Sequence, residues 1–208
     1  IDKIYLKSLA EQQVSIVPTL WRSNFTAKDL NEFFKYFNCQ QLVIKPRISA
    51  NADNTFWLKK PTAEDSVSQL EAVFSDGHFM VQPFISSVID EGEFSLFYFN
   101  GEYSHAILKT PKQDDFRVQE EHGGRLKAID PEADLLAQAQ SSLLAITREV
   151  GEIPLYARLD FVRVSNRKDD EQFALMEAEL IEPSLYFNMD NKAASRFANA
   201  FVASMEKY

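Results

Sequence analysis

The sequence is poor in cysteine and in basic residues. Cys39 is the single cysteine among 208 residues, so an intrachain disulfide is excluded and a reducing, cytoplasmic compartment is expected. Lysine and arginine number 22 against 31 acidic residues, which gives a formal net charge of −9. Such a chain lacks the electrostatic footprint of a nucleic-acid-binding protein and the basic segments that attract anionic lipid. It also lacks a run of about 18 apolar residues, so no membrane span or membrane partner is expected.

Several well-known active-site motifs are also missing. The sequence contains no GxSxG, no GxGxxG and no GxxxxGK[ST], which leaves a serine hydrolase, a Rossmann enzyme and a P-loop enzyme without support. It has three histidines, and none of them stand at the spacing of zinc ligands. The chemistry therefore has to come from carboxylates, lysines and arginines.

What is abundant is apolar and aromatic sequence arranged in short periodic segments. Hydrophobic residues make up 45% of the chain and 17 residues are phenylalanine, enough for compact cores. The alternation of helical and strand patterns, with a change of composition near residue 84, predicts an α+β protein with two lobes, 1–84 and 85–208. The expected helices are 2–12, 27–37 after an N-cap at Thr26, 62–74 after an N-cap at Thr62, 133–150, and a last helix capped by Asp190 with Ala194, Phe197, Phe201 and Met205 on its inner face. The expected strands are 14–18, 42–46, 79–84, 93–99, 102–109, 155–164 and 173–181, with a polar loop over 110–130.

Two acidic side chains stand next to each other on one face of a predicted strand. In 174-ALMEAELIEP-183, Glu177 and Glu179 alternate with apolar residues and lie about 7 Å apart by strand rise. The preceding strand, 155-LYARLDFVRV-164, carries Arg158 and Asp160 on its polar face. If the two strands pair through the turn 165-SNRKDD-170, three carboxylates converge, and hard oxygen ligands of this kind suit Mg²⁺. The alternative is a solvated outer face of an edge hairpin.

Basic residues at two places suit an anionic ligand. Lys45 ends the apolar strand 42-LVIKP-46, where an ammonium group can hold a phosphate. Arg117, in 116-FRVQEEHGG-124, can grip a carboxylate or phosphate through two hydrogen bonds. The ordinary alternatives are a solvated lysine and a polar loop.

In their order along the chain, these segments resemble a known family. The series LVIKP, MVQPFI, GEFSLFYFNGEYSHAILK, FRVQEEHGG, YARLDFV and MEAELIEPSLYF resembles the ATP-grasp ligases, and among them most the glutathione-synthetase-like branch. The resemblance covers essentially the whole chain. It implies an ATP-grasp fold of two α+β lobes with ATP between them. It also implies an ATP- and Mg²⁺-dependent ligase that activates a carboxylate as an acyl phosphate for attack by an amine or another nucleophile.

The resemblance assigns nucleotide-binding roles to residues from both halves of the chain. Lys3 and Lys45 match the lysines that touch the phosphates, and Glu91 falls near the acidic residue that binds ribose. Lys109, at the end of the hairpin, is included among the nucleotide contacts. The segment whose backbone reads adenine is matched by Gln82, Pro83, Phe84 and Ile85.

The same resemblance assigns the catalytic and metal-binding roles. Arg117 matches the arginine that steadies the transferred phosphate or the acyl group. Asp160, Glu177 and Glu179 match the magnesium ligands, although the last ligand in the family is often asparagine. Arg158 shares their face, is expected to offset the extra charge of Glu179, and is grouped with Arg117 as a catalytic residue.

Two departures from the family pattern leave alternatives open. Residues 49-SANA-52 stand where a glycine-rich phosphate loop is expected, and the resemblance begins at the first residue, so the family's N-terminal domain is expected to be absent from this chain. The sequence predicts the ATP-binding part of a ligase. The alternatives are a nucleotide-binding module without ligase activity and a structural α+β domain. The identity of the small carboxylate and amine substrates is open, as is the formation of a homo-oligomer.

Overall fold

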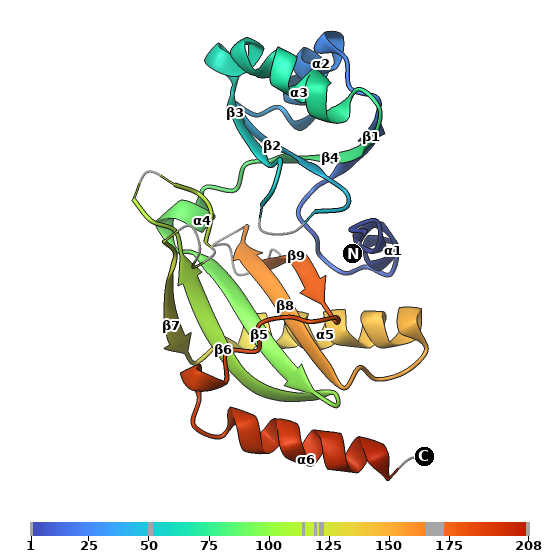
Figure 1. Cartoon of the computed structure of the whole chain (residues 1–208), viewed down its shortest axis with the longest axis vertical. Coiled ribbons are helices and arrows are strands. Elements are labelled where there is room, and N and C mark those ends of the chain that lie inside the picture. The colour runs from blue at the N-terminus through green and yellow to red at the C-terminus, as the bar shows by residue number, and fades with distance from the viewer. Residues whose placement is uncertain are drawn as a thin grey trace. The chain divides into compact units, whose positions relative to one another are not determined.

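The structure is a computed structural model that describes residues 2–49, 52–113, 115–118, 120, 123–164 and 173–206 (Figure 1). The predicted turn at 165–170 and part of the predicted phosphate loop lie outside these residues. The helices are α1 (Tyr5–Glu11), α2 (Ala27–Phe37), α3 (Val67–Phe74), α4 (Ser87–Asp90), α5 (Ala133–Val150) and α6 (Ala193–Met205), with 3₁₀ turns η1 (Lys60–Ser66) and η3 (Phe187–Met189). The strands are β1 (Leu20–Ser23), β2 (Gln41–Pro46), β3 (Phe56–Lys59), β4 (His78–Pro83), β5 (Glu93–Phe99), β6 (Glu102–Thr110), β7 (Arg125–Ile129), β8 (Tyr156–Arg163) and β9 (Phe173–Glu179).

The chain forms two compact units, each with its own antiparallel sheet. Unit 1 consists of Ile1–Tyr5 and Val17–Ile85, and unit 2 of Leu6–Ile16 and Ser86–Tyr208. The chain passes from one unit to the other at Ile85, next to the expected lobe boundary, but most of α1 belongs with unit 2. This happens because Leu6 and Leu9 are fully buried there, while Ser8 Oγ donates a 2.7 Å hydrogen bond to Glu149 of α5.

Unit 1 is a four-stranded sheet covered on one face by α2 and α3 (Figure 1). The strand order is β1-β4-β2-β3, with β4 antiparallel to both β1 and β2. One face of the sheet is almost wholly apolar and packs against aromatic side chains of the two helices. The buried cluster contains Leu30, Phe33 and Phe34 of α2, Leu70 and Phe74 of α3, and Leu42, Ile44, Leu58, Phe79 and Val81 of the sheet.

The start of α2 was predicted to the residue. Thr26 has extended backbone angles, and its N–H donates a 2.7 Å hydrogen bond to the Asp29 carboxylate, three residues into the turn. This reciprocal contact satisfies a donor that the first helical turn leaves without a partner. The helix ends at Asn38, which adopts a left-handed conformation (φ 48°).

Unit 2 is a five-stranded sheet in the order β7-β6-β5-β8-β9, antiparallel throughout. Its central hairpin turns at Asn100 and Gly101, whose φ angles of 48° and 86° are those that a tight two-residue turn requires. A β-bulge follows, because Phe97 pairs with His105 whereas Tyr98 pairs with Tyr103. The extra residue shifts the register of β6, so every later side chain changes its partner on β5.

Helices α5 and α6 are both part of unit 2, and each buries apolar side chains there. α5 buries Leu135, Ala139 and Leu143, and it ends at Gly151, whose φ of 88° favours glycine. α6 rests on the sheet through Phe197, whose ring lies 5.3 Å from that of Phe99.

The predicted inner face of α6 was wrong in part. Ala193 and Ala200 are buried together with the contact made by Phe197, whereas Phe201 and Met205 are 47% and 63% exposed. Apolar residues occupy more than one face of this helix, so the sequence pattern does not say which face the sheet covers.

Three other elements also differ from expectation. Residues 14–18 form one isolated bridge, Ile16 to Leu175, and the strand of this region is β1. The loop predicted over 110–130 contains the edge strand β7. The helix predicted over 62–74 begins as the 3₁₀ turn η1, with Pro61 in its first turn, and becomes α-helical only at Val67. Among the described residues, no helix is both long and apolar enough to cross a bilayer.

Candidate functional site

One face of the five-stranded sheet carries a set of charged side chains from four neighbouring strands. Strand pairing places Glu93 opposite Lys109, Ser95 opposite Asp160, Asp160 opposite Glu177 and Arg158 opposite Glu179. Because alternate residues of a strand share a face, these side chains lie together. We call the following residues the charge network: Glu93, Ser95, Lys109, Arg158, Asp160 and Glu179.

Asp160 is the centre of the charge network. It is 3% exposed, and its Oδ1 accepts a 2.5 Å hydrogen bond from Ser95 Oγ and a 3.4 Å contact from Lys109 Nζ. Its Oδ2 accepts hydrogen bonds from Arg158, 3.1 Å from Nε and 3.0 Å from Nη2. Both carboxylate oxygens are therefore held in fixed directions.

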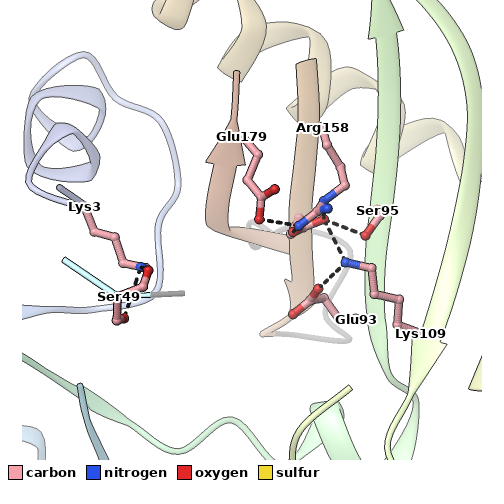
Figure 2. A network of polar contacts seen from close by, with 8 residues as sticks. Lys3, Ser49, Glu93, Ser95, Lys109, Arg158 and Glu179 are labelled. Carbon is pink, nitrogen blue, oxygen red and sulfur yellow. Dashed lines mark hydrogen bonds and ion pairs between the residues drawn. The ribbon is translucent and has the colours of Figure 1, made fainter. Parts of the chain in front are cut away.

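The two cations each join Asp160 to a second carboxylate. Lys109 Nζ donates to Glu93 Oε1 at 3.0 Å, and all three side chains of this group are buried. Arg158 Nη2 donates to Glu179 Oε1 at the other end, where Glu179 is half-buried (Figure 2). With Glu177, four carboxylates stand against two cations, which leaves a formal charge of −2 on this face.

Burial and neighbouring charges act in opposite directions on these groups. Burial would raise the pKa of Asp160, but Arg158 and Lys109 outweigh it and hold the pKa below its ordinary value. For Glu93, burial outweighs the attraction of Lys109 and raises the pKa. Burial also raises the pKa of Glu179, although Arg158 opposes it. With four carboxylates against two cations, this face carries an excess of negative charge that a further cation would offset.

That Asp160, Glu177 and Glu179 bind a magnesium ion together stays a prediction. They do share a face, and Asp160 and Glu177 are direct partners. However, the Arg158 guanidinium joins Asp160 to Glu179, and within the described ranges no group of three or more Asp, Glu, His or Cys is arranged to hold a metal ion. The carboxylate ligands and the excess negative charge fit Mg²⁺. In this structure the Arg158 guanidinium lies between two of these carboxylates, those of Asp160 and Glu179.

Arg117 and Glu91 have partners other than the charge network. Arg117 Nη2 donates to Asp115 Oδ2 at 2.8 Å, and this arginine lowers the pKa of Asp115 to about 2. The Arg117 side chain is 39% exposed. Glu91 accepts hydrogen bonds of 2.9 and 3.1 Å from Arg163, whose guanidinium also lies 4.3 Å from the centroid of the Phe173 ring. A ligand at either residue would compete with an existing ion pair.

The two predicted phosphate-binding lysines both lie in unit 1. Lys3 is buried, and its Nζ donates a 2.9 Å hydrogen bond to the backbone oxygen of Ser49, at the start of the expected phosphate loop (Figure 2). Lys45 is half-buried on β2, opposite Met80 of β4. It is on the sheet face opposite the aromatic core, because Ile44 and Leu42 point into that core.

The predicted adenine-reading segment is the exit from unit 1. Gln82 is buried and its Nε2 donates to Thr19 Oγ1 at 2.9 Å. Pro83 has no N–H. The N–H of Phe84 donates to Gln41 O at 3.0 Å, so it extends the sheet. The groups of this segment that could hydrogen-bond to a base are therefore the N–H of Ile85 and the backbone carbonyls.

Sequence reasoning missed several members of this arrangement. Glu93 and Ser95 were not proposed. A hairpin without the bulge would pair Glu93 with Leu108 instead of Lys109, and the pairing of Ser95 with Asp160 joins strands far apart in the sequence. Arg163 was missed as the partner of Glu91, since the two are far apart in the chain. Trp57, which stacks on Phe84, was also missed, because an isolated tryptophan carries no sequence signal of its neighbour.

Comparison with solved structures identifies the fold of the chain. The chain aligns over 97% of its length with D-alanine–D-alanine ligase from Bacillus anthracis in complex with ATP, with a TM-score of 0.65 and 18% identity, covering 64% of that chain. It covers 60% of the ATP-grasp ligase PsnB at a TM-score of 0.67 and 16% identity. The chain has the ATP-grasp fold, as the sequence predicted, and its structure is similar to those of ATP-grasp ligases.

A more similar relative is known from both sequence and structure. The cycloserine biosynthesis protein DcsG of Streptomyces lavendulae is 29% identical over 213 residues, which span 99% of this chain and 70% of DcsG. The crystal structure of D-cycloserine synthetase DcsG superposes with a TM-score of 0.84 over 98% of this chain and 69% of that chain, at 27% identity. No family model matches the chain. The relationship supports an ATP-dependent ligase.

Proposed function

We propose that this chain is the ATP-binding part of a ligase that joins a small carboxylate to an amine or another nucleophile through an acyl phosphate. The observation that carries the proposal is the charge network on the polar face of a sheet with the ATP-grasp fold. Burying charges is costly unless they are paired, and a hydrophobic replacement is often as stable. Retaining two cations and an excess of carboxylates on this face favours a role in chemistry.

The residues that the resemblance assigns to the nucleotide keep those roles in this proposal. Lys3 and Lys45 supply compact positive charges for the phosphates, and Glu91 would accept hydrogen bonds from the ribose. The adenine would be read by the backbone around Ile85, since Phe84 N–H is engaged with Gln41. Lys109 is held between Glu93 and Asp160, so its part is to fix those carboxylates and to contribute positive charge near the phosphates.

The metal proposal rests on Asp160, Glu177 and Glu179. These residues would hold Mg²⁺, with Arg158 releasing at least one of its two carboxylate partners. When bound, Mg²⁺ neutralises charge on the phosphate oxygens and orients them for transfer. Arg158, once freed from Glu179, is placed to stabilise negative charge that develops during transfer.

The proposed reaction has two steps. An oxygen of the substrate carboxylate attacks the γ-phosphorus, the bond to the β–γ bridging oxygen breaks, and ADP leaves. The nucleophile then attacks the acyl carbon, loses its proton, and displaces inorganic phosphate. Arg117 would clamp the phosphate or the acyl oxygen through its two-pronged guanidinium, at the expense of its pair with Asp115.

The test is ADP release by the purified protein with ATP and MgCl₂ over a panel of small acids and amines. D-alanine is the first candidate, because one solved protein of this fold is a D-alanine–D-alanine ligase. We expect Glu177→Gln to lower ADP release at least about a hundredfold, on the scale of losing preorganised electrostatic stabilisation. Glu102→Gln, an exposed carboxylate on β6 of the same sheet, is the matched control and should leave the rate unchanged.

Circular dichroism should show that both variants keep the fold. ATP binding without ADP release for any acid and amine, also in a protein extended to the length of its relatives, would support the nucleotide-binding module instead. Absence of ATP binding would contradict both functions.

A further inference from the structure

A closed group of contacts surrounds Trp57 at the exit from unit 1. The Trp57 ring stacks on Phe84, with ring centroids 4.5 Å apart and planes inclined by 20°. Lys59 Nζ lies 4.5 Å from the centroid of the same indole. Trp57 Nε1 donates a 2.9 Å hydrogen bond to Gln41 Oε1, and the Gln41 backbone oxygen accepts the N–H of Phe84 at 3.0 Å. We call Gln41, Trp57, Lys59 and Phe84 the Trp57 cluster.

The strand register explains how this group forms. Val43 pairs with Trp57 on one side and with Gln82 on the other, and Gln41 pairs with Lys59. Trp57 and Lys59 therefore share the sheet face that the aromatic core does not occupy. From this position the indole reaches across β2 to Phe84, just beyond the end of β4.

A ligand ring cannot stack on the Trp57 indole, because both faces of the indole are occupied. Phe84 covers one face of the indole at stacking distance, and a cation at 4.5 Å from the centroid takes the other face, because both cannot occupy the same side. The Nε1 donor is already committed to Gln41. Trp57 can therefore influence a ligand only through the residues it holds.

What it holds is the backbone that leaves the sheet. Pro83 fixes its own φ and has no N–H, so the direction of the chain after β4 depends on Phe84. Phe84 is fixed twice, by its N–H to Gln41 and by its ring on Trp57. These two contacts restrict the backbone of Phe84, the residue directly before the Ile85 amide.

We infer that Trp57 is a positioning residue for nucleobase recognition: by clamping Phe84, it orients the 82–85 backbone that distinguishes adenine from other bases. The inference rests on the proposed function, in which this segment reads the base. A preorganised backbone binds without the cost of ordering at the moment of binding, and its hydrogen bonds then discriminate between bases. In the proposed function Lys3 and Lys45 hold the phosphates, so the Trp57 cluster would affect base selectivity and not triphosphate binding.

The experiment measures dissociation constants by calorimetry for ATP, GTP and inorganic tripolyphosphate, each with MgCl₂. Trp57→Leu removes the stack and the Nε1 donor, and we expect it to weaken ATP about tenfold. GTP and tripolyphosphate should change less than about twofold, so the preference for ATP over GTP shrinks. Trp57→Phe keeps an aromatic face and should restore most of the preference.

Trp21→Leu is the matched control, because Trp21 is the second of the two tryptophans, lies on β1 of the same sheet, and is also half-buried. It should leave all three constants unchanged. Urea unfolding of each variant shows whether unit 1 remains folded under the assay conditions.

Each outcome separates the inference from the function on which it rests. An unchanged ATP-to-GTP ratio in Trp57→Leu overturns the inference and leaves the proposed function intact. Equal weakening of ATP and tripolyphosphate assigns Trp57 a purely structural part and also overturns it. A wild-type protein that binds tripolyphosphate but shows no preference for ATP overturns it as well. If the wild-type protein binds no ATP, the proposed function fails, and the inference fails with it.

Discussion

The two sheets of this protein bury different kinds of side chain. In unit 1 the covered face of the sheet is aromatic and aliphatic, and the Phe79 ring contacts the rings of Phe25, Phe33 and Phe74. In unit 2 part of one sheet face is buried as ions, with Lys109 and Asp160 each 5% exposed or less. Apolar contacts depend little on pH or salt, whereas buried charges depend on every partner being present.

This difference indicates that the apolar residues that stabilise unit 1 and the charged residues proposed for the chemistry lie in different sheets. The aromatic cluster of unit 1 supports a sheet whose other face carries Lys45 and Trp57. The charge network of unit 2 is itself the candidate chemical site. A change in the first should lower stability without altering how the protein responds to pH, and a change in the second should alter both.

The largest effect is expected from removing the lysine of the charge network. Lys109→Met leaves Glu93 and Asp160 buried without the cation that joins them, and the free energy of unfolding of unit 2 should fall by about 3 to 5 kcal/mol. The loss should be smaller at pH 5 than at pH 7, because burial raises the pKa of Glu93 and its protonation removes one buried charge. Urea denaturation followed by circular dichroism at both pH values measures this.

Lys127→Met is the matched control for that prediction. Lys127 is exposed on β7 and pairs with Leu108, next to Lys109 in the same sheet. We expect a change within about 0.5 kcal/mol. Equal and small effects of the two substitutions would show that the charge network is solvated, and the contrast between the two units would disappear.

A smaller effect is expected in the aromatic cluster of unit 1. Phe79→Leu keeps an apolar side chain but removes ring contacts at 6.1 Å to Phe25 and 5.1 Å to Phe74, so we expect a loss of about 1 to 2 kcal/mol. The loss should be the same at pH 5 and pH 7. Tyr36→Leu serves as control, since Tyr36 is 66% exposed. A marked pH dependence of the Phe79→Leu effect would show that unit 1 also depends on buried charge.

The smallest effect concerns alkaline pH and again belongs to unit 2. Burial and the neighbouring Asp130 raise the pKa of Tyr103 to about 12, while an unfolded tyrosine titrates near 10. Between these values the unfolded state gives up more protons, so the free energy of unfolding falls as pH rises from about 10 to 12. Because Tyr103 is 37% exposed, solvent limits the loss to about 1 kcal/mol.

Tyr103→Phe tests this assignment directly. Unfolding midpoints between pH 9 and 12 should fall less steeply in the variant, and the absorbance of ionised tyrosine should lose a late phase. Identical slopes for the two proteins would remove Tyr103 as a source of alkaline instability.

Local sequence patterns predicted much of the fold. The Thr26 cap, the extent of α2 and α5, the Asn100–Gly101 turn and the pairing of β8 with β9 were read correctly. Each of these depends on residues near each other in sequence or on a strict period of 2 or 3.6. For the same reason the sequence placed Arg158, Asp160, Glu177 and Glu179 on one face.

Edge and irregular elements were not predictable in this way. β7 is an edge strand with three exposed residues, so it has little apolar alternation to show. α6 carries apolar residues on more than one face, and contact with Phe99 selects one of them. The bulge between Phe97 and Tyr98 has no sequence mark that we recognised, yet it decides which β6 residue faces Glu93.

The sequence by itself determined the fold class, the family resemblance and the residue types of the site, because periodicity, turn chemistry and short motifs are local properties of a chain. Only the tertiary structure decided the partners: Lys109 with Glu93 and Asp160, Arg158 with Asp160 and Glu179, Arg163 with Glu91, and Trp57 with Phe84. Strand register sets the contacts of Lys109 and Arg158, and a one-residue shift at a bulge moves a side chain to the opposite face. Whether a buried lysine is free for a phosphate or committed to two carboxylates is therefore a matter of register, which the list of residues alone does not contain.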